Sequence, residues 1–470
     1  MKMNSTTRSS LATLPRPGDV GYRLHRGVRG VRDALAAEDF AGIQAYFDGL
    51  APADIGDILR KMDQPQMAAL LPLVDEDERY DVFVYLPLSL QEKHVNTLSR
   101  SESVELFHKL APDERADLFM QLSEEEQQRV LPALAHAERE DIRRLTSYKE
   151  GTAGAVMTSE YASLKADLTV EAAIRELRRV APDRETIYNA YVVDDERRLI
   201  GVVSLRDLII AAPESLVRDI MEQRVIRARG IDARRDVARK IAKYDLMALP
   251  IVDANEHIIG IVTADDAMDV AAAESTATMH RAMAVGDLSI GLKEATVGLL
   301  FRKRVFWLVL LVFGNIFSGA GIAYFEDFIA ANVTLVFFLP LLIDSGGNAG
   351  SQSATLMVRA LGTGDVESSD WAKLFLREWG VALLLGLAMA FAVSWLGWWR
   401  GGLDIAYVVS MTMVAVVMLG SLIGLTLPFI FTRLNLDPAS ASGPLITSIC
   451  DGLGVLIYFT VATRVLPPLL

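Results

Sequence analysis

Residues 344–355 have the sequence DSGGNAGSQSAT and lie inside an otherwise apolar run from Phe328 to Val358. A charged side chain at the centre of a membrane helix costs about 2.5–3.5 kcal/mol on insertion scales, so it persists where it faces water, a cation or a partner. Glycines allow two helices to approach closely, and they can also open the backbone so that carbonyl groups face a cavity. The stretch therefore predicts either a close-packed helix seam or one wall of a hydrophilic path.

A second polar stretch leads to Asp451, which lies in the middle of the run Pro438–Thr463. No Lys or Arg lies within that run to neutralise the carboxylate. We interpret Asp451 as a carboxylate that faces a pore, and the alternative is a protonated Asp in a hydrogen bond between helices. The two stretches together predict the walls of one path, with side-chain oxygens from Asp344, Asn348, Ser351, Gln352, Ser353, Thr355, Thr447, Ser448 and Asp451.

Three further uncharged runs are long enough to cross a bilayer, whose core needs about 20 apolar residues in a helix. They are Val305–Phe325, Trp379–Trp399 and Ile405–Thr432. With the two polar runs, they predict a membrane domain of five α-helices. Residues 305–470 hold 6 Lys/Arg and 10 Asp/Glu, whereas the first 304 residues hold 41 and 50, so a charged soluble part precedes the membrane part.

The cations that flank the predicted spans are distributed unevenly, and an excess of Lys and Arg marks the cytoplasmic side of a membrane. One side has Arg302, Lys303, Arg304, Arg359, Lys373, Arg377 and Arg433, and the other has Arg400 and Arg464. We therefore expect the N-terminus and the soluble part to be cytoplasmic and the C-terminus to lie outside.

The net charge of −13 argues against a nucleic-acid partner.

The membrane part contains no His and a single Cys, Cys450, so coordination of zinc or copper is not expected there. A lining of oxygen atoms with few carboxylates suits a hard cation. Mg²⁺ in particular keeps its waters and is held by one or two carboxylates. A symmetric dimer with its axis along the pore would present two copies of Asp451 to the ion.

Residues 151–274 contain an internal repeat in which Gly201 and Gly260 occupy equivalent positions. Each copy predicts a β-α-β-β-α unit with the signature G-[VI]-V-[ST]-x-x-D, which resembles the CBS domain pair. In such modules the Ser or Thr and the Asp of the signature contact an adenosine ribose; here they are Ser204 with Asp207 and Thr263 with Asp266. The alternative is that these residues only cap the helices that follow.

Residues 48–141 are strongly acidic, with 21 Asp/Glu against 9 Lys/Arg. Leu-Pro pairs such as Leu71-Pro72 and Leu131-Pro132 mark the starts of short helices, because Pro is tolerated in a first helical turn. The pattern predicts an all-α, superhelical stack. Its acids either match helix dipoles or are neutralised by cations at an interface with the next domain.

An acidic helical N-domain, two CBS repeats, a connecting helix and five spans in this order resemble the MgtE family of magnesium channels. Residues 346–355 and 448–454 also resemble motifs of that family. The resemblance implies a multidomain organisation. It consists of a flexible N-terminus (1–34), the acidic N-domain (35–146), CBS domain 1 (147–211), CBS domain 2 (212–271), a connecting "plug" helix (272–300) and the transmembrane domain (301–470).

The resemblance further implies a homodimer in the bacterial inner membrane that transports Mg²⁺, with Mn²⁺ and Co²⁺ as further candidate ions. Asp451 would bind hydrated Mg²⁺, and the path would be lined by Gly347, Asn348, Ser351 and Thr355. Cytoplasmic Mg²⁺ would close the pore by bridging the N-domain, the CBS pair and the plug helix, and ATP can bind the CBS pair. The regulatory ligands of the family are matched by Asp245, Asp266, Asp269 and Glu274.

The chain departs from the family pattern at Ala277 and Thr278, where relatives carry acids at the start of the plug helix. The leading hypothesis is still a magnesium channel gated by Mg²⁺. The alternative is a Na⁺- or H⁺-coupled divalent cation exchanger, which the extra carboxylate of Asp344 would allow. We do not expect an enzyme, because the sequence contains no H-E-x-x-H, G-x-x-x-x-G-K-[ST] or G-x-S-x-G motif.

Overall fold

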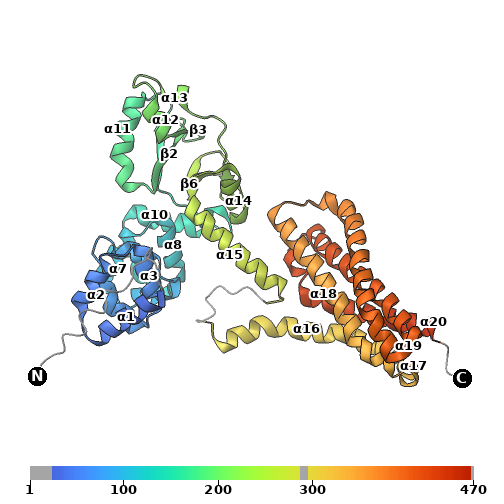
Figure 1. Cartoon of the computed structure of the whole chain (residues 1–470). Helices are drawn as coiled ribbons and strands as arrows, with labels where there is room; N and C mark the ends of the chain where they lie inside the picture. Colours follow the sequence, from blue (N-terminus) through green and yellow to red (C-terminus); the bar gives the residue numbers. More distant parts are fainter. Residues whose placement is uncertain (1–23, 286–294, 467–470) are drawn as a thin grey trace, which may run out of the picture. The chain divides into compact units, whose positions relative to one another are not determined.

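The computed structural model describes residues 24–285 and 295–466. The chain divides into two compact units, Met1–Ala271 and Ala272–Leu470. The first unit contains the helical N-domain and the CBS pair, and the second contains the long apolar helices (Figure 1).

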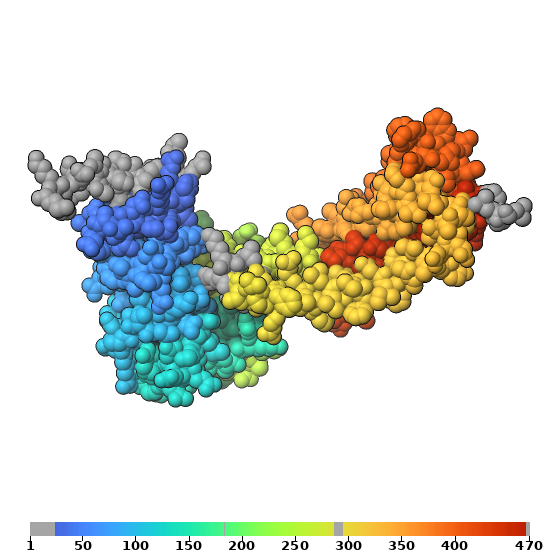
Figure 2. All heavy atoms as spheres, turned by 90° about the horizontal axis from the view of Figure 1, so that it is seen from below, coloured from blue at the N-terminus to red at the C-terminus, as the bar shows by residue number. Residues whose placement is uncertain are grey.

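The N-domain is a stack of short helices whose colour changes steadily across it in Figure 2, so helices adjacent in sequence are neighbours in space. This confirms the predicted helical N-domain. Within the described residues its helices are α1 (Leu24–Ala36), α2 (Phe40–Phe47), α3 (Pro52–Leu59), α4 (Gln64–Leu70), α5 (Arg79–Val84), α6 (Leu88–Val95), α7 (Arg100–Lys109), α8 (Pro112–Gln121), α9 (Glu124–Val130) and α10 (His136–Thr146), with 3-10 turns η1 (Leu71–Leu73) and η2 (Leu131–Ala133).

A twelve-residue repeat underlies this stack. Leucines recur at this spacing where successive helices end, at Leu86, Leu98, Leu110, Leu122 and Leu134. A donor side chain five residues later hydrogen-bonds the leucine carbonyl in several repeats: Gln91 to Leu86 (2.8 Å), Arg115 to Leu110 (2.7 Å), Gln127 to Leu122 (3.0 Å) and Arg139 to Leu134 (2.7 Å). These donors satisfy carbonyl groups that a helix end leaves without a partner. Each repeat is thereby tied to the one before it.

The first helix of the structure differs from the prediction that residues 1–34 are flexible. Residues 1–23 lie outside the described residues, but α1 begins at Leu24 and buries Val28 and Val31 in the N-domain core. Its apolar side chains pack against the same core as Ile43 and Phe47 of α2. The folded part of the N-domain therefore includes residues that we had placed in a flexible terminus.

The predicted CBS pair is confirmed, with a three-stranded sheet in each repeat. In both sheets the first strand pairs parallel to the second and the second antiparallel to the third. The first repeat contains β1 (Tyr161–Lys165), α11 (Val170–Val180), β2 (Thr186–Val193), β3 (Leu199–Ser204) and α12 (Leu205–Ile210). The second contains β4 (Ala228–Arg229), α14 (Arg234–Tyr244), β5 (Ala248–Val252), β6 (Ile258–Thr263) and α15 (Ala264–Ala282), while α13 (Val217–Ile220) lies between them.

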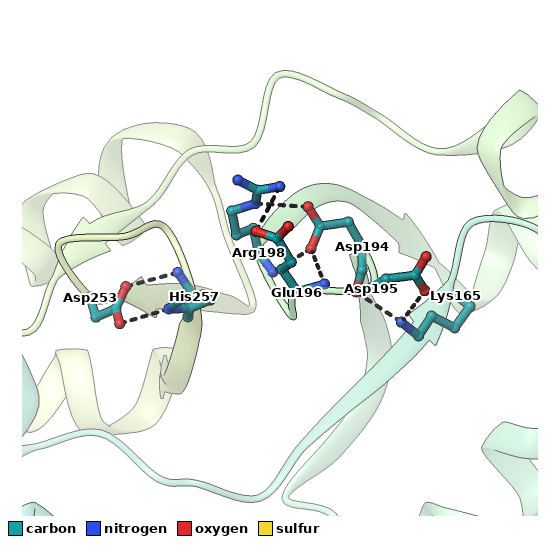
Figure 3. Close-up of polar contacts among 7 residues, drawn as sticks. All are labelled: Lys165, Asp194, Asp195, Glu196, Arg198, Asp253 and His257. Atoms are coloured by element: carbon teal, nitrogen blue, oxygen red, sulfur yellow. Dashed lines mark hydrogen bonds and ion pairs between the residues drawn. The ribbon is translucent and has the colours of Figure 1, made fainter.

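The same turn is built twice, once in each CBS repeat (Figure 3). Asp194 Oδ1 accepts from the backbone amides of Glu196 and Arg198, and Asp253 Oδ1 accepts from those of Asn255 and His257. The second carboxylate oxygen meets the side chain of Arg198 in one copy and of His257 in the other, both at 2.9 Å. Asp at this place fixes the turn between the last two strands, because its side chain replaces backbone acceptors.

Helix α15 begins in the second CBS repeat and ends at Ala282, which places the start of the predicted plug segment within this helix. Residues 286–294 of the predicted plug segment lie outside the described residues, and α16 begins at Val297. The prediction of a single helix over residues 272–300 is therefore wrong, because residues 283–285 and 295–296 are not helical and Ala284 has a positive φ of 54°.

The second unit contains α16 (Val297–Tyr324), α17 (Glu326–Ala331), α18 (Thr334–Thr363), α19 (Trp371–Arg433) and α20 (Gly443–Val465). By length and composition, the segments Val297–Tyr324, Ser368–Arg433 and Gly443–Val465 qualify as membrane-spanning among the described residues. Helix α18 is long enough to span, and its polar residues reduce its hydropathy. These helices support an integral membrane protein, and the count of five spans stays a prediction.

Helix α19 contains two of the predicted spans, because its backbone breaks at Gly402 (φ 80°, ψ −172°). A positive φ of this kind is readily adopted only by glycine. The two halves then run back along each other: Ser410 Oγ donates to the carbonyl of Ala390, and a Cβ at Gly397 would lie 2.7 Å from Cα of Ala406. The break is therefore a helical hairpin that separates Trp379–Trp399 from Ile405–Thr432.

A four-glycine seam joins α18 to the second half of α19. A Cβ at Gly350 would lie 2.7 Å from the carbonyl oxygen of Gly420, and a Cβ at Gly420 or Gly424 would clash with the carbonyl oxygen of Gly346 or Gly350. The seam interpretation is therefore correct for Gly346 and Gly350. The alternative of an opened backbone is wrong, because α18 is helical from Thr334 to Thr363.

Candidate ion path and regulatory site

The polar residues of α18 lie on one face of the helix, because they recur at spacings of three or four residues. This face, which we call the polar face, consists of Asp344, Asn348, Ser351, Gln352 and Thr355. A hollow of about 610 Å³ is lined by Asn348, Ser351, Gln352, Thr355 and Leu356. Four of the predicted path residues, Asn348, Ser351, Gln352 and Thr355, thus line one hollow.

The hydrogen bonds of the polar face leave mainly acceptor atoms for a ligand. Thr355 Oγ1 donates its proton to the carbonyl of Ser351 (2.8 Å), and Asn348 Nδ2 donates to Asp344 Oδ2 (3.0 Å). A hydroxyl whose proton is engaged offers lone pairs, and the Asn amide keeps its carbonyl oxygen as an acceptor. Such a lining is suited to a cation or to the water molecules that surround one.

Helix α20 brings the second polar stretch to the same place. A Cβ at Gly347 would lie 2.9 Å from Thr447 Cγ2, so Gly347 provides the close contact between α18 and α20. Thr447 Oγ1 also donates to its own backbone, at Pro444 (2.9 Å). Asp451, one turn further along α20, is partly exposed and interacts electrostatically with Asp344. The structure therefore brings together the path residues predicted on both helices.

A cluster of carboxylates lies between the N-domain and the CBS pair. Helix α8 contributes Asp113, Glu114 and Asp117, and the CBS pair contributes Glu185 and Asp266; we call these five residues the acidic cluster. Oδ1 of Asp113 is buried and has no hydrogen-bond partner. Like charges held this close disfavour the contact unless a cation or protons neutralise them.

Burial is the main cause of the altered acidity in the acidic cluster. It raises the pKa of Asp113 well above the usual range, with repulsion from Asp266 as the next cause. It raises the pKa of Glu114 to about 7 and that of Asp117 to about 6. The pKa values of Glu185 and Asp266 are also raised by burial, with neighbouring carboxylates adding to the effect.

The four predicted regulatory ligands do not form one group in the structure. Asp266 lies in the acidic cluster, and Asp269 acts on it electrostatically from the same helix. Asp245 ends α14 in a left-handed conformation, and Glu274 lies further along α15. Across residues 24–285 and 295–466, no set of three or more His, Cys, Asp or Glu side chains is arranged to hold a metal ion.

Asp113, Glu114, Asp117 and Glu185 were not predicted as site residues, although the N-domain is predicted to be acidic. The sequence signal for these acids was the composition of residues 48–141, which hold 21 Asp/Glu against 9 Lys/Arg. It indicated an interface with cations, but it could not identify which acids face the CBS pair.

The two predicted ribose-binding pairs differ in their surroundings. Ser204 caps α12 by accepting from the amide of Asp207, and its hydroxyl donates to Asp207 Oδ2 (2.6 Å) at an exposed position. Thr263 Oγ1 donates in the same way to Asp266 Oδ2 (2.5 Å), but Asp266 belongs to the acidic cluster. Capping is therefore observed for Ser204, and the second pair lies where carboxylates would repel a phosphate group.

A second hollow, of about 450 Å³, lies beside α14 and was not predicted. It is lined by Val225, Ile226, Arg227, Arg239, Lys240, Lys243 and Tyr244. Its cations have partners within the protein: Arg227 pairs with Glu256 (2.6 Å), and Lys240 donates to the carbonyl of Arg227 (3.1 Å). We assign it no role in transport.

The raised pKa values predict how pH acts on the contact between α8 and the CBS pair. An acid whose pKa is higher in the folded contact than in water favours that contact when protonated, so the contact weakens as pH rises. Between about pH 4.5 and about pH 7, Glu114 (pKa about 7) and Asp117 (pKa about 6) hold protons in the contact that they lose in water, so protection of α8 amides from hydrogen exchange should fall over this range without divalent cations.

Millimolar Mg²⁺ should remove this pH dependence, because an ion bound to the ionised carboxylates would take the place of their protons. The measurement is hydrogen exchange of the full chain at the two pH values, with EDTA or with Mg²⁺. Protection that rises with pH in EDTA would contradict the assignment of the acidic cluster.

Comparisons with known proteins agree with this organisation. A family model described as a divalent cation transporter matches residues 339–461, the MgtE intracellular N domain matches residues 50–151, and the CBS domain matches residues 153–214 and 217–273. The order of an MgtE N domain, a CBS pair and a helical membrane region therefore places the chain in the class of divalent cation transporters.

Individual relatives narrow the class. The magnesium transporter MgtE of Thermus thermophilus is 42% identical over 328 residues, which is 70% of this chain and 73% of the relative. The magnesium transporter MgtE of Bacillus subtilis is 33% identical over 422 residues, 89% of this chain and 93% of the relative. A solved cytosolic domain of the Mg²⁺ channel MgtE in complex with ATP is 34% identical, with a TM-score of 0.49, and covers 52% of this chain and 99% of its own. The chain belongs to the MgtE family of magnesium transporters, which are not enzymes.

Proposed function

We propose that this chain carries Mg²⁺ across the bacterial inner membrane through a pore at the interface of a homodimer. The observation that supports this most directly is the polar face of α18, where Asn348, Ser351 and Thr355 line a hollow of about 610 Å³ and Asp344 accepts a hydrogen bond from Asn348. Because a hydrated Mg²⁺ ion donates hydrogen bonds through its waters, acceptors at this spacing can hold it without removing its hydration shell.

A dimer accounts for the exposure of this face. Asp344, Asn348 and Thr355 are exposed in the single chain, although α18 lies in an otherwise apolar unit. Lipid contact with such groups is costly, so they require water or a second protein surface. Two chains related by a symmetry axis along the pore would enclose both polar faces and both copies of Asp451 around one water-filled path.

The acidic cluster supports closure by cytoplasmic Mg²⁺. Its carboxylates repel one another across the contact between the N-domain and the CBS pair, and bound Mg²⁺ would replace repulsion with attraction. Asp266 lies in the first turn of α15, so a change at the acidic cluster acts on the helix that leads toward the membrane domain. Asp245, Asp269 and Glu274 stay proposed ligands of further regulatory ions.

ATP is a proposed second ligand of the CBS pair, at Ser204 and Asp207. This pair is exposed, whereas Asp266 of the second pair belongs to the acidic cluster, whose negative field disfavours a triphosphate. We therefore expect one nucleotide site per chain in place of two.

The test is Mg²⁺ uptake into proteoliposomes under an imposed membrane potential, with equal Na⁺ and H⁺ on both sides. We expect uptake that follows the potential and stops when millimolar Mg²⁺ bathes the side that carries the soluble domains. Uptake that requires a Na⁺ or H⁺ gradient would support a coupled exchanger, which the names of the Thermus thermophilus and Bacillus subtilis relatives do not favour.

A further inference from the structure

Arg281, in the last turn of α15, forms an ion pair with Asp437 in the segment that connects α19 to α20. The distance from Arg281 Nη1 to Asp437 Oδ2 is 2.5 Å, and the side chains are 26% and 32% exposed. The other carboxylate oxygen, Oδ1, accepts from the amide of Ala439 (2.8 Å). Asp437 is therefore fixed on both oxygens, and a partly buried, charge-assisted pair of this kind is stronger than an exposed one.

The pair holds the end of α15 next to the ion path. A Cβ at Gly443, the first residue of α20, would lie 4.0 Å from the carbonyl oxygen of Ala282 and 3.6 Å from Ser351 Oγ. Ser351 lines the hollow of about 610 Å³. The residue that follows Arg281 is thus within contact distance of the helix start that borders the polar face.

The composition of α15 near this contact indicates that no metal ion is needed to hold the end of α15 against Asp437. From Ser275 to Ala282 the helix has no carboxylate, and Ala277 and Thr278 lie one turn before Arg281. A divalent cation between this end of α15 and Asp437 would find an acidic partner on one side only. The guanidinium of Arg281 supplies the positive charge from within the chain, at a fixed position.

We propose that Arg281 and Asp437 form a metal-independent latch, which holds the C-terminal end of α15 beside the hollow and favours the closed pore. The latch acts in addition to the proposed closure by cytoplasmic Mg²⁺, and its effect on flux rests on the proposed ion path. The latch shifts the equilibrium between open and closed pores toward the closed state before Mg²⁺ binds.

The test measures Mg²⁺ uptake into proteoliposomes for Arg281→Gln and for Asp437→Asn, which keeps the acceptor for the Ala439 amide. Coupling between two sites typically changes an equilibrium about 5- to 150-fold. At the low end of that range, each variant should raise uptake about fivefold without cytoplasmic Mg²⁺ and require about fivefold more Mg²⁺ for half inhibition. Arg433→Gln, at the end of α19, is the matched control and should leave both values unchanged.

Two further variants test the pairing itself. The double variant Arg281→Gln with Asp437→Asn should behave like either single variant, because one broken pair cannot be broken twice. The reversed pair, Arg281→Asp with Asp437→Arg, should restore low uptake. Uptake unchanged in the single variants, an equal change in the Arg433 control, or a reversed pair that fails to restore low uptake would each overturn the latch.

The latch and the proposed function fail in different ways. Loss of the latch appears in uptake measured without cytoplasmic Mg²⁺, whereas failure of Mg²⁺ gating appears as uptake that millimolar Mg²⁺ does not inhibit in the unmodified chain. An Arg281→Gln variant that is more active at zero Mg²⁺ would support the latch even if the acidic cluster proved not to bind Mg²⁺.

Discussion

Replacing Asp451 by Asn should reduce Mg²⁺ uptake at least about 100-fold, which corresponds to about 2.7 kcal/mol in the barrier. Asn has nearly the same shape as Asp and keeps one acceptor oxygen, so the loss comes from the charge. In a dimeric pore the change removes two negative charges that face the ion, and each attracts a divalent cation strongly where water is scarce. The measurement is proteoliposome uptake under a membrane potential, with cytoplasmic Mg²⁺ kept low.

The matched control for this prediction is Asp404→Asn. Asp404 is an exposed carboxylate of the same unit, two residues after the break of α19 at Gly402. Its neutralisation should leave uptake within about twofold of the unmodified chain, because exposed charges are screened by salt. Uptake that persists in the Asp451→Asn variant would contradict a role for Asp451 in the ion path and would leave it only a packing role in α20.

The second large effect concerns the acidic cluster. The double variant Asp113→Asn with Asp266→Asn should raise the Mg²⁺ concentration for half inhibition at least about tenfold, because it removes two of the charges that attract the ion. Mg²⁺ uptake at low cytoplasmic Mg²⁺ should persist, since neither residue belongs to the ion path. The readout is uptake as a function of Mg²⁺ on the side of the soluble domains.

A charge of opposite sign at the same place gives an independent test. Asp117→Lys supplies a tethered cation to the acidic cluster, so uptake should be low even without cytoplasmic Mg²⁺. Glu196→Lys, in the turn between β2 and β3, is the control for a new surface lysine (Figure 3). Inhibition by Mg²⁺ that is unchanged in the Asp113 and Asp266 double variant would show that the acidic cluster is not the sensor.

Much of the fold could be predicted because local chemistry determines it. The CBS strands follow from two similar apolar segments separated by an Asp-based turn, at Asp194 and Asp253. The apolar helices follow from the lengths of uncharged runs. The twelve-residue repeat of the N-domain was missed because its donor positions hold different residues, such as Gln91 and Arg115, which share hydrogen bonding but not hydropathy.

The candidate sites were predictable only where one helix carries the whole pattern. Asn348, Ser351 and Thr355 recur on a single face, so their spacing alone places them together. The acidic cluster and the Arg281–Asp437 pair join residues far apart in the chain; in the second case 156 positions separate the partners. No local periodicity reports such contacts, and they depend on how domains and loops pack.

The four-glycine seam between α18 and α19 restricts which parts of the membrane domain can move. At Gly420 and Gly424 the two backbones are in direct contact with Gly346 and Gly350, and even one added methyl group would collide with a carbonyl oxygen. Packed elements of this kind do not deform gradually. Helix α18 and the second half of α19 must therefore move as one rigid body. The width of the proposed path at Ser351 then changes only when this body is displaced relative to α20 or to a second chain.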